Sequence, residues 1–257
     1  MHVHQIAAIA RFSILEAWRT RLFSLYVIAL LLIWAAAFFL HELAITESAR
    51  IELSVLAAGA RLAAVCVLCL HVVTSITREF NDKGLELVLA SDLSRSHYIL
   101  GRLAGFLMTG AALAAIAAIP ILLASPSPAA CLWALSLMLE LAIVAALSLF
   151  CVITFMQLIP AAAFVFGFYL LARAMTAIRL MSDAPISGAD APAHHVMAMM
   201  IDGLALVVPS LDNYAQSSWV VEHTTGWSVL GTNAVQTAIY VSLLAAAAMF
   251  DFYRKEL

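Results

Sequence analysis

Long apolar stretches separated by short polar breaks dominate this chain of 257 residues. An α-helix needs about 20 consecutive, mainly apolar residues to cross a bilayer. By that criterion we predict six spans, at about 22–42, 54–76, 99–124, 129–156, 160–181 and 232–250. The SPSP sequence at 125–128 is typical of a tight turn, and Pro160 suits the first turn of a helix. The pattern therefore predicts an all-α, polytopic membrane protein with one transmembrane domain over residues 1–257.

Two segments outside the spans also have helical patterns. Residues 1–21 carry an apolar stripe of Ile6, Ile9 and Ile14 beside Arg11, Glu16 and Arg19, which predicts a helix in the membrane interface; the alternative is an extension of the first span. Residues 182–231 contain HVMAMMIDGLALVVP at 195–209, which is too short to cross and too apolar for an ordinary loop. This segment predicts a re-entrant or interfacial hairpin before the last span. Its candidate residues are His194, His195, Met197, Asp202 and Pro209.

Composition strengthens the membrane prediction and narrows the chemistry. The chain is 65% hydrophobic and 11% charged, with a mean hydropathy of +1.02, whereas a soluble domain is nearer half apolar and a quarter charged. The net charge of −3 gives no reason to expect nucleic-acid binding. The four cysteines lie in apolar runs, so we expect no disulfide framework. Cys66 and Cys69 form a CxxC without a second pair, which favours packing over a metal or redox site.

The distribution of Lys and Arg predicts the orientation of the chain. With the N-terminus in the cytoplasm, nine of the thirteen basic residues fall in segments on that side. Cytoplasmic segments of membrane proteins carry an excess of Lys and Arg. We therefore expect both termini, and the segment between the second and third spans, to be cytoplasmic.

The motifs expected of an enzyme are missing from the sequence. HEL at 41–43 lacks the second histidine of a zinc-binding HExxH, and no GxxxxGK[ST] phosphate-binding loop is present. We accordingly predict no catalytic residue, no metal site and no cofactor bound by this chain.

Three charged residues fall within predicted spans: Arg61, Glu140 and Arg173. Such residues are costly in a bilayer and usually face a bundle interior or a cavity. Their similar predicted depth allows one buried ion network. A structural Glu140–Arg173 pair and a lining of a substrate path are both compatible with this pattern.

The segment 78–98 is the most polar part of the chain. Eight charged residues lie between Arg78 and Arg102, in a chain otherwise poor in charge. Within EFNDKGLELVLAS, leucines and Phe80 can form an apolar surface while Glu79, Lys83 and Glu86 stay in water, and Gly84 permits a break. A short, charged and partly apolar helix between two spans suits docking to a soluble partner. The alternative is an ordinary solvated loop.

This segment resembles the first cytoplasmic loop of type-2 ABC transporter permeases, the membrane subunits of ABC exporters. Members of that family carry a Glu after the second span, a Gly-x-Glu-hydrophobic run, and a Ser-Arg pair and a Tyr before Gly-Arg. The matching positions here are Glu79, Gly84, Leu85, Glu86, Leu87, Ser94, Arg95, Tyr98, Gly101 and Arg102. The family commonly has a proline before Ser-Arg, where this chain has Asp92 and Leu93. Six spans, an N-terminal amphipathic helix and an apolar hairpin before the sixth span also match the family plan.

The resemblance implies a function that composition does not. It implies a permease subunit that pairs with a second permease, most simply a second copy of itself, in a bacterial-type inner membrane. It implies two separate ATPase subunits that bind ATP and Mg²⁺ and act through the loop 79–96. The coupling residues it implies are Glu79, Phe80, Lys83, Gly84, Glu86, Leu87 and Arg95. The alternatives are a permease for copper or haem maturation, and a structural membrane subunit that docks a soluble partner without transport.

Overall fold

The structure is a computed structural model, and it describes residues 2–43, 47–81, 95–183, 199–201, 203–204, 208–222 and 227–254. Its long helices are α1 (His2–Arg19), α2 (Leu22–Leu43), α3 (Ser48–Asn81), α5 (Arg95–Ala124), α6 (Pro128–Phe155), α7 (Leu158–Asp183) and α10 (Trp227–Arg254). Two short helices, η1 (Leu211–Asn213) and α9 (Ser217–Glu222), precede α10. No strand occurs within the described ranges. The all-α prediction is confirmed.

All six predicted spans are present as helices long and apolar enough to cross a membrane: α2, α3, α5, α6, α7 and α10. Several are longer than the apolar runs that predicted them, because their polar ends continue the helix. The clearest case is α3, which extends the predicted 54–76 to Ser48–Asn81. The chain is therefore a multi-pass membrane protein.

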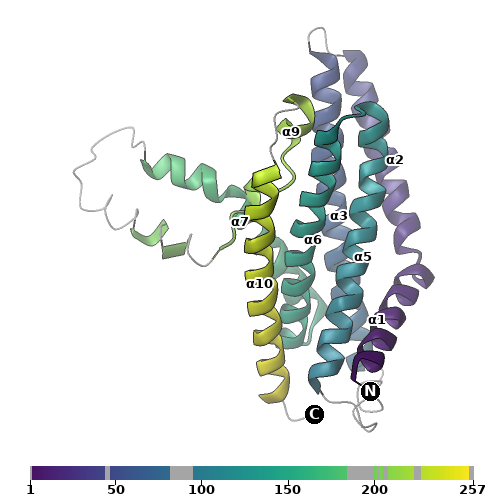
Figure 1. Cartoon of the computed structure of the whole chain (residues 1–257), viewed down its shortest axis with the longest axis vertical. Coiled ribbons are helices and arrows are strands. Elements are labelled where there is room, and N and C mark those ends of the chain that lie inside the picture. Colours follow the sequence, from purple (N-terminus) through teal and green to yellow (C-terminus); the bar gives the residue numbers. More distant parts are fainter. Residues whose placement is uncertain are drawn as a thin grey trace.

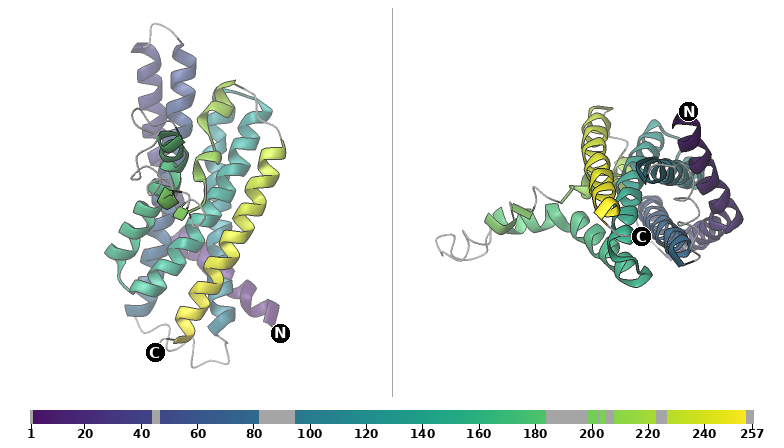
Figure 2. Two further views of the ribbon diagram at one scale, coloured as in Figure 1. Left: turned by 90° about the vertical axis from the view of Figure 1, so that its left-hand side faces the viewer. Right: turned by 90° about the horizontal axis from the view of Figure 1, so that it is seen from below.

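Helix α6 is the centre of the bundle. It packs against α3, α5, α7 and α10, and most of its span is buried, whereas α2 and α10 are mostly exposed. The first residue of α1 and the last residues of α10 lie toward the same end of the bundle (Figure 1), which we call the terminal end. The last residues of α3 and the first residues of α5 also lie at this end (Figures 1 and 2). The last part of α7 projects away from the other helices in both figures.

Helix α1 packs directly on α5 through two glycines. A Cβ atom added at Gly101 would lie 2.8 Å from Ile9 Cβ, and one at Gly105 would lie 2.5 Å from Ser13 Cβ. These glycines form a GxxxG pattern, which lets two helix backbones approach closely. The buried face of α1 consists of the small residues Ala10, Ser13 and Ala17. It therefore differs from the predicted stripe of Ile6, Ile9 and Ile14, all three of which are half-buried.

The close α1–α5 contact gives a matched pair of substitutions. Gly105→Ala places a methyl group against Ser13 and the Ala10 carbonyl, so one helix must shift, and we expect a loss of about 1–3 kcal/mol. Gly167→Ala on α7 is the control, because nothing lies within 4 Å of its added Cβ. It should be neutral or slightly stabilising, since Ala favours helix over Gly. Thermal unfolding of both variants in detergent measures the difference, and equal melting temperatures would contradict the close packing.

Candidate functional site

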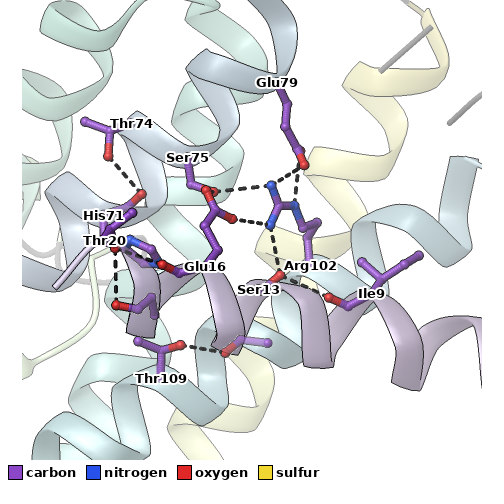
Figure 3. A network of polar contacts seen from close by, with 12 residues as sticks. Ile9, Ser13, Glu16, Thr20, His71, Thr74, Ser75, Glu79, Arg102 and Thr109 are labelled. Atoms are coloured by element: carbon purple, nitrogen blue, oxygen red, sulfur yellow. Dashed lines mark hydrogen bonds and ion pairs between the residues drawn. The ribbon is translucent and has the colours of Figure 1, made fainter. Parts of the chain in front are cut away.

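A buried arginine joins three helices near the terminal end. Arg102 of α5 is fully buried, and its Nη1 donates hydrogen bonds to Ser13 Oγ and Glu16 Oε2 of α1, both at 2.9 Å. On the side of α3, its Nη2 donates to Ser75 Oγ at 3.2 Å and its Nε donates to Glu79 Oε2 at 3.1 Å. Figure 3 shows these side chains converging on the guanidinium group. A guanidinium suits this position because its fixed fork of N–H donors can serve several acceptors at once.

Three further contacts complete what we call the Arg102 network: Ser13, Glu16, Ser75, Glu79, Tyr98 and Arg102. The Tyr98 hydroxyl donates to Glu79, and Arg102 Nη2 forms a second ion contact with the same carboxylate. Ser75 donates to Glu16 Oε1 at 2.6 Å. The guanidinium also lies 5.5 Å from the centre of the Phe12 ring and 5.6 Å from that of Phe106. One cation thus faces two carboxylates and two aromatic rings, which offsets the cost of burying its charge.

Glu16 is held in its charged form. Burial alone would raise the pKa of this carboxyl group, but the hydrogen bonds from Ser75 and Arg102 and the charge of Arg102 outweigh it. The net effect lowers the pKa of Glu16 below its usual value of 4.5. A carboxyl group whose pKa is lowered by folding stabilises the fold above its unfolded pKa, and this contribution is lost as the pH falls through the folded pKa.

The pKa of Glu16 predicts how stability depends on pH. At pH 7 we expect Glu16→Gln to be less stable than the wild-type chain by about 1–3 kcal/mol, because a charge-assisted contact with Arg102 is weakened. The gap should stay constant down to about pH 5 and then shrink in more acid solution, where the wild type also becomes protonated. Unfolding curves of both proteins from about pH 7 to pH 3 measure the gap. If the stability gap widened on acidification, the pKa of Glu16 could not be lowered in the folded protein, and the prediction would be rejected.

Of the seven residues expected to contact a partner subunit, the structure describes three. Glu79 belongs to the Arg102 network, and Phe80 is partly buried against the core. Arg95 Nη1 donates to the Phe252 carbonyl at 3.3 Å and lies over the Phe252 ring, which connects α5 to α10. Lys83, Gly84, Glu86 and Leu87 lie outside the described residues. The described flanks of the segment are therefore anchored to the bundle.

Away from the terminal end, residues 208–216 enter the bundle as mostly irregular backbone, and we call them the inserted segment. The Ala215 amide donates to Ser136 Oγ of α6 at 3.1 Å. Ser136 lies eight residues into α6, or about 12 Å from the start of that helix. The Ala215 carbonyl accepts from Arg61 Nη1 and from Trp133 Nε1, both at 2.9 Å. Irregular backbone at membrane depth needs such partners, because lipid offers none.

Among the charged residues within the spans, the two arginines bind the backbone of the inserted segment. Arg173 Nη1 donates to the carbonyls of Leu211 and Tyr214, at 2.5 and 2.9 Å, and lies 3.6 Å from Glu140 Oε1. The predicted Glu140–Arg173 pair is therefore present between α6 and α7. Tyr169 donates to the same Glu140 oxygen at 2.9 Å. Arg61 belongs to the same group of buried polar contacts. Its bond in this group goes to the backbone carbonyl of Ala215 and not to the carboxylate of Glu140.

The predicted outer hairpin falls mostly on undescribed residues. His194, His195, Met197 and Asp202 lie outside the described ranges, while Pro209 is buried at the start of the inserted segment. Residues 199–201 and 203–204 are helical, and Met199 and Met200 are exposed.

Sequence reasoning missed several polar residues that hold these two sites. The sequence marks Arg102 only as part of a Gly-Arg motif at the start of a predicted span, but it is the buried centre of the network. Trp133, Ser136 and Asn233 fall within predicted spans and nothing in the sequence marks them, although Asn233 Nδ2 donates to Asn213 O at 3.1 Å and so binds the inserted segment. The GxxxG at 101–105 was a usable signal that another helix packs beside Arg102. No protein-family model matches this chain, and no curated protein matches it.

Proposed function

We propose that this chain is the membrane permease subunit of an ATP-driven ABC exporter, and that the segment 79–96 receives motion from a cytoplasmic ATPase subunit. The observation that carries the proposal is the Arg102 network. It connects α3 and α5, the two helices on either side of the segment, to each other and to α1.

A segment that transmits movement must be joined rigidly to the helices it moves. Arg102 supplies that joint, because separating α3 from α5 would strip a buried cation of Glu79 and Ser75. Helix α5 also packs against the central helix α6, and Arg95 links it to α10. A push at the segment therefore displaces several spans together rather than bending a loop. The resemblance of the segment to permease coupling loops supports the same role.

The remaining parts of the proposal follow from this one. The chain would lie in a bacterial-type inner membrane with both termini in the cytoplasm, paired with a second permease, most simply its own copy, and two ATPase subunits. ATP and Mg²⁺ would bind in those subunits, and this chain alone would not be catalytic. At the opposite side of the membrane, the inserted segment is well suited to closing the outer end of a path, because it fills the bundle between α3, α6 and α7.

Purification from native membranes tests this assignment. We expect the tagged chain to bring down a protein with a GxxxxGK[ST] phosphate-binding loop, identified by mass spectrometry. Gly84→Pro and Glu86→Arg in the segment should reduce its recovery several-fold. These are better probes than Glu79→Ala, because Glu79 also holds the Arg102 network and its loss would affect stability.

The control is Arg50→Gln at the start of α3, an exposed residue that pairs only with the nearby Glu47 within the described part of the chain. It should leave recovery unchanged. Recovery of a different soluble protein, lost in the same segment variants, would favour the docking subunit without transport. Undiminished ATPase recovery with Gly84→Pro and Glu86→Arg would reject the segment as the coupling site.

A further inference from the structure

A pocket of about 570 Å³ lies between the α1–α2 junction and α3, beside the Arg102 network. Its basic side chains are Arg19 of α1 and Arg78 of α3, both exposed and neither ion-paired with any residue that the structure describes. They line the pocket from two different helices. Two guanidinium groups that have no ion-pair partner among the described residues favour an anion at this pocket, above all a phosphate, which guanidinium binds by paired hydrogen bonds.

A second observation points to a ligand in the same place. His71 lines the pocket and is only 6% exposed, yet its Nε2 atom has no hydrogen-bond partner among the residues that the structure describes. Its ring packs edge-on against Phe106 at 5.9 Å on the side of α5. Buried polar atoms are normally paired, so an unpaired one beside a hollow indicates a missing partner. Figure 3 shows His71 near Glu16, Thr20 and Thr74, which line the same pocket.

The acidic residue in the pocket does not oppose an anion. Both Glu16 oxygens are already used, one by Ser75 and the other by Arg102. The Thr20 and Thr74 hydroxyls donate to carbonyls of their own helices. Among the described residues that line the pocket, Arg19 and Arg78 therefore carry the charge that no ion pair balances.

Both walls change from polar to apolar in the same direction. On α3, Arg78, Thr74 and His71 are followed toward the middle of the span by Leu70 and Val67. Val67 lies about 16 Å along the helix axis from Arg78. On the facing wall, Arg19 and Thr20 are followed by Leu22 and Leu25. Leu25 and Leu70 are exposed, so the apolar half of the pocket opens toward the lipid.

We propose that this pocket binds the phosphate of an anionic phospholipid from the surrounding leaflet. The headgroup phosphate lies between Arg19 and Arg78, and an acyl chain follows the leucines of α2 and α3. A soluble phosphate could satisfy the arginines but would leave the apolar half unused. The bound lipid would hold α1 against α3 at the level of the Arg102 network. The assignment does not depend on the proposed transport function.

The test is native mass spectrometry of the full chain in detergent, titrated with phosphatidylglycerol, phosphatidylcholine or glycerol phosphate. We expect phosphatidylglycerol to be retained most strongly. Arg19→Gln and Arg78→Gln should each weaken its binding about fivefold, and the double variant about twenty-fivefold, since each basic residue near an anionic lipid contributes on the order of 1 kcal/mol. Arg19→Lys with Arg78→Lys keeps the charge and should restore most of the binding.

Arg11→Gln is the matched control, because Arg11 is an exposed arginine of α1 outside the pocket. It should bind phosphatidylglycerol as the wild type does. An equal loss in Arg11→Gln would mean general attraction to basic surface and would overturn the site. Equal retention of phosphatidylcholine would overturn selectivity for an anionic lipid. Glycerol phosphate binding as tightly, with the same dependence on the two arginines, would assign the pocket to a soluble phosphate instead.

Discussion

Replacing Arg102 by methionine should be among the most damaging single changes in this protein, with an expected loss of about 3–5 kcal/mol. Methionine fills much of the same volume but leaves Glu16 and Glu79 facing each other without their shared cation. Breaking a buried ion contact by removing one partner costs more than the contact contributes, because the remaining charges stay desolvated. Folded yield in detergent and the melting temperature both report the change.

Two companion variants isolate the cause. Arg11→Met removes an exposed arginine from α1 and should change the melting temperature little. Arg102→Lys keeps the charge but loses the fork of donors, so we expect an intermediate result. An Arg102→Met protein that melts with the wild type would show that the network contributes nothing to stability.

The second large effect is expected at the inserted segment. Arg173→Met removes the donor to the Leu211 and Tyr214 carbonyls and the nearest cation of fully buried Glu140. We expect a loss of about 3–5 kcal/mol. Arg179→Met, on an exposed position of the same helix, is the control and should be close to neutral. Thermal unfolding measures both.

Adding Glu140→Gln to Arg173→Met separates the two causes of this loss of stability: the unpaired charge of Glu140 and the two carbonyls without a donor. The glutamine removes the unpaired charge and can still accept from Tyr169, so stability should partly return. It should not return fully, because the two carbonyls still lack their donor. Exchanging the two charges should fail for the same reason, since a glutamate at position 173 cannot donate to a carbonyl. Full recovery in either double variant would show that the ion pair alone matters.

The spans were predictable because the bilayer imposes a length and an apolar composition on each helix. The Glu140–Arg173 pair was also within reach, since charges in neighbouring apolar helices have few other partners. The Arg102 network was not, because its members come from three helices and each looks ordinary alone. Arg102 follows a glycine at the start of a span, where basic residues commonly mark the membrane boundary. Only packing of α1 against that position makes it an interior residue.

The packing of the inserted segment inside the bundle could not be predicted from the sequence, for a related reason. Residues 208 and 209 end the predicted hairpin, but residues 210–216 have neither the apolar length of a span nor a helical period, so nothing local predicts that they enter the bundle. Their partners Arg61, Trp133 and Arg173 lie on three different helices. Trp133 fits any apolar span, and its donor role follows only from where the Ala215 carbonyl lies. Long-range pairing of this kind is set by the tertiary fold, and hydrophobic patterning does not encode it directly.

The glycine contact between α1 and α5 determines when α1 can pack into the bundle during synthesis of the chain. Glu16 and Arg102 are 86 residues apart, so at about 5–20 residues per second the ribosome makes them roughly 4–17 s apart. During that interval α1 has emerged without the helix that covers its small-residue face. Its final docking must therefore wait until the third span, α5, has been inserted, so α1 is made first but reaches its place only after α2 and α3 have also been made.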